Sequence, residues 1–73
     1  MPWTIDDFPA AMRHLSPVVR AKAVDIANAL LAEGHPEGQA IRIAIARAQQ
    51  WARRRGLPER AANAVYGSFH GLR

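Results

Sequence analysis

The residues best suited to chemistry lie in one short basic stretch, residues 49–55, which reads Gln-Gln-Trp-Ala-Arg-Arg-Arg. Guanidinium groups bind phosphates and an indole ring stacks on bases, so this mixture of cations, amides and an aromatic could hold nucleic acid. The candidate nucleic-acid-binding residues are Arg42, Arg47, Trp51, Arg53, Arg54 and Arg55. The alternative is that Trp51 flanks the core and the arginines form a solvated helix end, where cations complement the helix dipole. We favour this structural explanation, because one short arginine run is a weak signal for nucleic acid.

Helical geometry divides these cations between two flanks. Successive residues of an α-helix are turned by about 100° from one another. We place Ile41 at the centre of the buried stripe of its helix. One flank then carries Arg42, Gln49 and Arg53, and the other carries Arg47 and Arg54.

A second candidate site is apolar. Ile43 projects nearly opposite the stripe centred on Ile41, and Tyr66 and Phe69 also fall outside the main stripe. Either the segment near Val65 and Tyr66 covers Ile43, or Ile43 is an exposed apolar spot at a partner interface. Because an exposed apolar patch on a small domain favours self-association, the candidate partner contacts are Ile43, Tyr66 and Phe69.

Side chains for catalysis or metal binding form no recognisable constellation. The chain has no cysteine, which excludes disulfides and thiolate zinc sites. Zinc and di-iron sites need ligands at a three- or four-residue helical spacing, which His14, His35 and His70 do not have. The chain also has no nucleophile elbow and no phosphate-binding glycine loop. We therefore expect no catalytic residue, no metal, no cofactor and no small-molecule substrate.

Length and charge narrow the class of protein. A chain of 73 residues is one domain, and its net charge of +4 suggests an acidic partner such as nucleic acid or an anionic membrane surface. A GC-rich genome would also produce this richness in arginine and alanine, without any functional demand. The chain has no run of about 18 apolar residues and no signal peptide, so we expect a cytoplasmic protein without membrane insertion.

Prolines and glycines divide the chain into elements. Ser16-Pro17 is a helix start, and Gly34 and Gly56 are helix stops. Thr4 and Asp7 resemble a capping pair within a turn. The predicted elements are a turn over residues 1–8, a short helix over 9–15, helices over 17–33 and 36–55, a further short helix over 58–66 and a mobile tail over 67–73.

The core follows from the apolar stripes of the two long helices. Small residues let these helices approach closely, and they are Ala23, Ala27, Ala44 and Ala48. Larger residues fill the seam beside them, namely Ile26, Leu30, Ile41 and Ile45. A lid over one side of the hairpin consists of Trp3, Phe8, Met12 and Leu15. The predicted fold is all-α, a compact three- to four-helix domain around an antiparallel helical hairpin.

Several of these segments resemble the ChaB-like family, small bacterial proteins described as cation transport regulators. The matching segments are residues 8–15, Asp25-Ile26 and residues 40–51, and the likeness covers residues 3–52. The opening Met1-Pro2-Trp3 is similar to an uncharacterised bacterial relative of that group. Ile45 and Gln49 stand where the ChaB-like pattern has Trp and Lys. The resemblance implies a compact helical fold and no catalytic residue.

Two hypotheses for function follow, both non-enzymatic. The first is a protein–protein or self-association module, suggested by the small core without disulfides and by the apolar residues outside the main stripe. The alternative is weak, sequence-tolerant nucleic-acid binding through the arginine-rich end of the second long helix.

Overall fold

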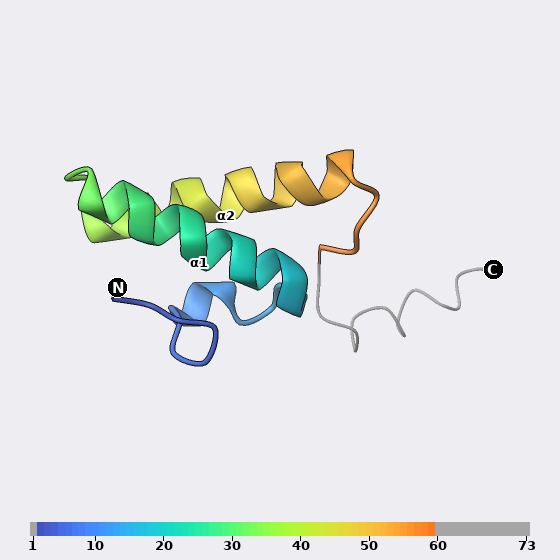
Figure 1. Cartoon of the computed structure of the whole chain (residues 1–73), viewed down its shortest axis with the longest axis horizontal. Coiled ribbons are helices and arrows are strands. Elements are labelled where there is room, and N and C mark those ends of the chain that lie inside the picture. Colours follow the sequence, from blue (N-terminus) through green and yellow to red (C-terminus); the bar gives the residue numbers. More distant parts are fainter. Residues whose placement is uncertain (1, 60–73) are drawn as a thin grey trace.

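The computed structural model describes residues 2–59, which form a hairpin of two antiparallel helices with the N-terminal segment packed against one side (Figure 1). Helix α1 spans Pro17–Ala32 and helix α2 spans Glu37–Arg54. A 3-10 helix, η1, spans Ala10–Met12. This part of the chain is all-α and compact, as the sequence predicts.

The prediction of three to four helices exceeds the two α-helices and one 3-10 turn of the described residues. The short helix expected over 9–15 is reduced to η1, which begins after Pro9, itself extended with φ −60° and ψ 142°. Most of the helix expected over 58–66, and the tail over 67–73, lie outside the described residues.

Both helices end in the same glycine-centred motif. After α1, Gly34 has φ 100°, its N–H donates to Leu31 O, and the next N–H, of His35, donates to Leu30 O. After α2, Gly56 has φ 69° and Leu57 N–H donates to Ala52 O at 2.8 Å. The positive φ favours glycine, and these bonds satisfy helix carbonyls that would otherwise have no partner.

Alanines make the seam between the helices. The seam residues Ala23, Ala27, Ala44 and Ala48 are all fully buried, together with Ala40 and Ala52. Ile26, Ile41 and Ile45 are only partly buried and pack along the sides of the seam. Small side chains at the centre let the backbones approach closely, so the large ones are displaced to the edges.

The N-terminal segment is held on α1 by two polar side chains as well as by apolar packing. Met12 and Leu15 are fully buried, and Trp3 and Phe8 pack against the same core. The buried Asn28 side chain accepts from Trp3 N–H at 3.2 Å and donates to Trp3 O at 2.9 Å. Arg20 also bridges this segment to α1, donating three hydrogen bonds to backbone carbonyls.

The segment after α2 returns to the start of α1. The Ser16 hydroxyl donates to Pro58 O at 2.8 Å and accepts from Val19 N–H, while Ser16 N–H donates to Glu59 O. The N-cap of α1 therefore also fixes the chain that leaves α2. This return brings Glu59 close to Arg53.

Candidate functional site

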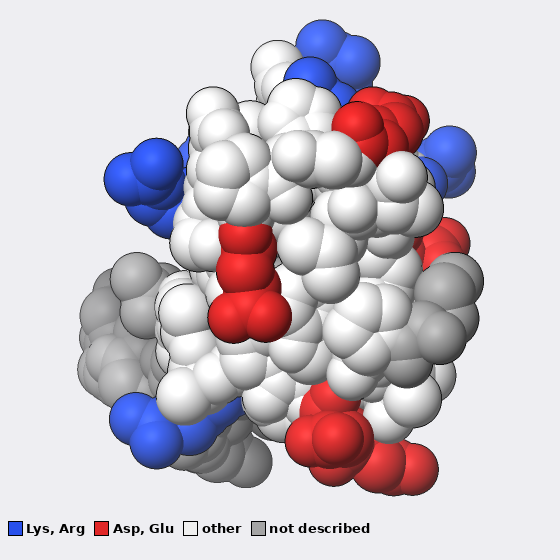
Figure 2. All heavy atoms as spheres, turned by 90° about the vertical axis from the view of Figure 1, so that its left-hand side faces the viewer, with Lys and Arg blue, Asp and Glu red and all other residues white. Residues whose placement is uncertain are grey.

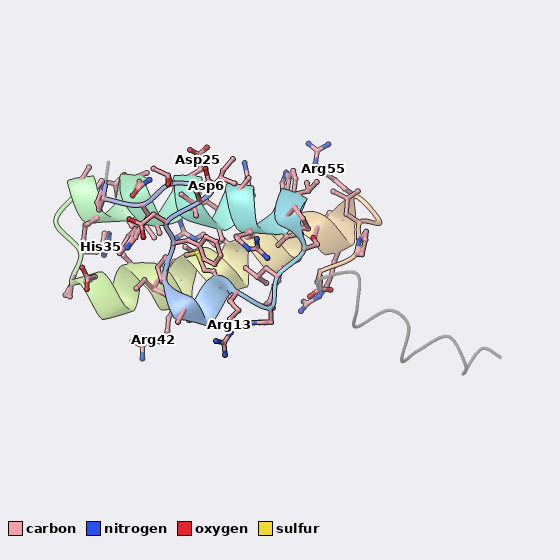
Figure 3. The ribbon with its side chains drawn as sticks, turned by 90° about the horizontal axis from the view of Figure 1, so that it is seen from below. Asp6, Arg13, Asp25, His35, Arg42 and Arg55 are labelled. Atoms are coloured by element: carbon pink, nitrogen blue, oxygen red, sulfur yellow. The ribbon has the colours of Figure 1, made fainter. Side chains whose placement is uncertain are left out.

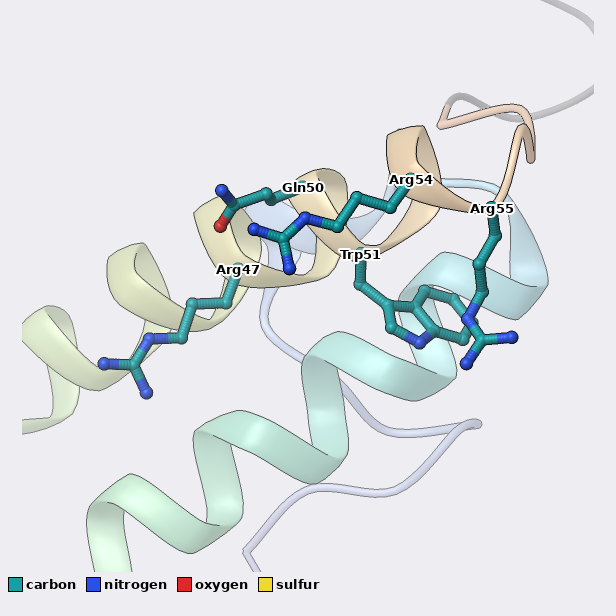
Figure 4. Close-up of a pocket in the computed structure, with 5 residues that line it drawn as sticks. All are labelled: Arg47, Gln50, Trp51, Arg54 and Arg55. Atoms are coloured by element: carbon teal, nitrogen blue, oxygen red, sulfur yellow. The ribbon is translucent and has the colours of Figure 1, made fainter.

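The arginine-rich end of α2 carries an open groove of about 470 Å³. We call it the basic groove, and it is lined by Arg47, Gln50, Trp51, Arg54 and Arg55 (Figure 4). Arg47, Gln50 and Arg54 follow a three- and four-residue spacing, so they form one row along α2. Arg55 follows α2 as its C-cap and reaches back over the ring of Trp51.

Trp51 links the basic groove to the core. Its half-buried ring packs against the core, and the Arg55 guanidinium lies 5.2 Å from the ring centroid. The Lys22 ammonium of α1 lies 5.3 Å from the same centroid. Each cation over an exposed ring contributes about 0.5–1 kcal/mol. Trp51 therefore flanks the core, as one of the two interpretations of the sequence predicts. Its ring also lies close to two cations, Lys22 and Arg55.

Lys22 is the contribution to this site that sequence reasoning missed. It belongs to α1 and has no arginine run around it. Lys22 and Trp51 lie at similar distances along the chain from the turn between α1 and α2. An antiparallel hairpin brings such positions opposite each other. The place of the turn in the sequence could therefore have predicted that Lys22 lies near Trp51.

The charge of the basic groove is not compensated within the described residues. None of its lining residues is acidic. The ion pair within residues 2–59 is Arg53 with Glu59 at 3.1 Å, and the Glu33 carboxylate also lies 3.8 Å from His35 Nε2. Arg47, Arg54 and Arg55 are exposed and have no carboxylate partner in this part of the chain.

The predicted nucleic-acid-binding residues separate into two groups. The structure brings together Arg47, Trp51, Arg54 and Arg55, and adds Gln50 and Lys22. Arg53 lies outside the groove and donates to Glu59. Arg42 is exposed and projects from the opposite side of the molecule to Arg55 (Figure 3). The two-flank spacing accounts for this division, since Arg42 and Arg53 share the other flank.

The candidate partner contacts are less fully described. Ile43 is half-buried and lies outside the hydrophobic cluster of the core. Tyr66 and Phe69, and the segment expected to cover Ile43, lie outside the described residues. The large apolar side chains exposed in the described part are Ile5, 58% exposed, and Val18, 55% exposed.

Acidic side chains gather at the opposite end of the hairpin from the basic groove. Glu33 and Glu37 flank the turn between α1 and α2. Figure 2, which looks onto that end, shows carboxylates over its face and Lys and Arg at its rim. The described part of the molecule therefore carries its charge unevenly along the hairpin, with carboxylates at the turn and guanidiniums at the groove.

No three His, Asp or Glu side chains of residues 2–59 come together in a group that could hold a metal ion. Neither of the two helices described is long and apolar enough to span a bilayer.

Fold and site together define the class of protein, a small α-helical hairpin with a cationic, aromatic groove on one flank of its second helix. The chain is similar to the uncharacterised protein YdaT of Bacillus subtilis (strain 168), with 52% identity over 52 residues. The match covers 71% of this chain but only 35% of that relative, so the chain corresponds to about a third of its length.

No known family matches the chain, and the ChaB-like assignment therefore remains a resemblance. No solved structure matches it either. The similarity to YdaT agrees with the expected likeness to an uncharacterised bacterial protein.

Proposed function

We propose that this chain is a non-enzymatic binding module that holds nucleic acid on the basic groove. The observation that carries the proposal is the set of exposed guanidiniums of Arg47, Arg54 and Arg55 beside an aromatic ring, without carboxylate partners in the described residues. Phosphates that bind such cations release condensed counterions, and this release drives association.

The expected binding is weak and tolerant of sequence. Guanidinium–phosphate contacts position a nucleic acid without reading its bases. Three such contacts are few, so we expect dissociation constants of about 10⁻⁴ to 10⁻⁶ M, the range of non-specific binding.

Salt dependence tests the proposal. Three neutralised phosphates give a slope of log K against log salt of about −2 on a single strand, so affinity should fall roughly tenfold to twentyfold between about 50 and 200 mM salt. Fluorescence anisotropy of a labelled oligonucleotide would measure this. Absence of binding at low salt, or equal binding of polyglutamate, would contradict the proposal.

Self-association is the second candidate, and the position of Ile43 is the observation that favours it. The side chain is half-buried but does not join the core. The chain has no cysteine, and residues 2–59 contain no group of His, Asp and Glu that could hold a metal ion and so stabilise the small domain. The proposed partner is a second copy of the chain, which would cover Ile43. Ile43 does not line the basic groove, so self-association through Ile43 and nucleic-acid binding in the groove would use different surfaces.

We expect the self-associating form to appear at high protein concentration and to be lost in Ile43→Asp. Sedimentation equilibrium of both proteins would measure the mass. Val18→Asp, at an exposed position at the start of α1, is the matched control for an added charge. A monomer at every concentration would rule this candidate out.

A further inference from the structure

We infer that the basic groove selects single-stranded over duplex nucleic acid, because an unpaired base stacks on Trp51 in place of the Arg55 guanidinium. The inference rests on the proposed function and names the form of its ligand. Three features of the groove support it: the way Arg55 is held, the ability of the Trp51 ring to stack on a base, and the positions of Arg47 and Arg54.

Arg55 is held over the ring in a way that allows its side chain to leave. Its backbone N–H donates to the carbonyls of Trp51 and Ala52, which fixes its main chain at the end of α2. Its guanidinium lies over the Trp51 ring and pairs with no carboxylate of residues 2–59. Swinging the guanidinium away therefore breaks no ion pair there and leaves the helix end intact.

A base is a better occupant of this ring than the cation it replaces. Stacking of a base on an aromatic side chain is stronger than the interaction of a cation with an exposed ring. The displaced guanidinium is then free to bind a phosphate of the same strand. The neighbouring amide of Gln50 has both donors and acceptors, as the Watson–Crick edge of an unpaired base does.

A duplex cannot make this exchange. The faces of its bases are hidden in the stack, so it offers the groove only phosphates and base edges. Arg47 and Arg54 lie two helical turns apart, about 10 Å along α2, and can bind phosphates of either form. Trp51 is therefore the residue that discriminates between the two forms.

Tryptophan fluorescence tests the inference directly. The chain has two tryptophans, so Trp3→Phe leaves Trp51 as the sole reporter. The bonds of Trp3 to Asn28 come from its backbone and survive this change. The probes are an oligothymidylate of about 12 nucleotides, within the site size of such grooves, and its duplex with oligodeoxyadenylate. We expect the single strand to bind about tenfold more tightly and to quench Trp51 fluorescence.

Trp51 variants separate stacking from charge. Trp51→Leu should lower single-strand affinity about tenfold and leave duplex affinity unchanged, while Trp51→Phe should keep part of the preference. If Trp51→Leu does not fold by circular dichroism, Trp51→Phe and the fluorescence of the Trp3→Phe protein decide. Equal affinity for both forms, or unquenched Trp51, would overturn this inference and leave the proposed function standing. No salt-sensitive binding to either form would overturn both.

Discussion

Replacing Arg47, Arg54 and Arg55 together with alanine should weaken nucleic-acid binding by about a hundredfold at low salt. Each guanidinium–phosphate contact at an exposed site contributes about 1 kcal/mol, and about 3 kcal/mol in total corresponds to this loss. The slope of log K against log salt should also become shallower by about 2 on a single strand, because three fewer phosphates are neutralised. Anisotropy titrations at several salt concentrations would measure both quantities.

The matched control removes the same charge from elsewhere. Arg13, Arg42 and Arg53 are exposed and lie outside the basic groove, and Arg13 and Arg42 project from the side opposite Arg55 (Figure 3). Their triple alanine variant should lose only a fewfold in affinity, through the lower net charge. An equal loss in both triple variants would mean that the whole surface binds, and the groove would then not be the site.

Arg20→Ala should lower the free energy of unfolding by about 2–3 kcal/mol, which in a domain of this size corresponds to a melting temperature lower by roughly 10–20 °C. The Arg20 guanidinium donates to Leu15 O at 2.8 Å, Arg13 O at 3.1 Å and Met12 O at 3.3 Å. It also lies 4.6 Å from the centroid of the Phe8 ring. Its loss leaves these carbonyls without that donor and removes one of the two polar side chains that hold the N-terminal segment on α1.

Thermal unfolding followed by circular dichroism would measure this loss. Arg13→Ala removes an exposed cation whose side chain makes no hydrogen bond within the described residues, so it should change stability by less than about 0.5 kcal/mol. Arg20→Lys keeps the charge but lacks the planar fork that reaches several carbonyls, so it should recover only part of the loss. A melting temperature of Arg20→Ala equal to that of the parent would contradict this role.

Arg20 and Asn28 make hydrogen bonds to the N-terminal segment that the periodicity of α1 does not predict. Both residues fall off the apolar stripe of α1, so residue spacing predicts no partner for either side chain. Their partners lie on another segment, Trp3 for Asn28 and the carbonyls around Met12 for Arg20. Such bonds depend on where the N-terminal segment lands on α1, and residue spacing within α1 does not contain that information.

The basic groove was only partly predictable, because helical spacing explains some of its features and tertiary contacts explain the others. The separation of Arg47 and Arg54 from Arg42 and Arg53 follows from helical spacing, which is a local property. The pairing of Arg53 with Glu59, six residues later, depends on how the chain turns after α2, and the approach of Lys22 to Trp51 is long-range. They need the return of the chain to Ser16 and the register of α1 against α2.

The sequence by itself determined the elements that depend on local chemistry: the start of α1 at Ser16-Pro17, the helix stops at Gly34 and Gly56, and the alanine seam. Caps and positive φ act within a few residues, and the helical spacing of the alanines along each helix is local too, so each leaves a local pattern. Only the tertiary structure decided which arginines share a groove and which polar side chains fasten the N-terminal segment. Those outcomes arise from packing between distant segments, where one carboxylate or carbonyl brought near a cation determines whether it remains free to bind a ligand.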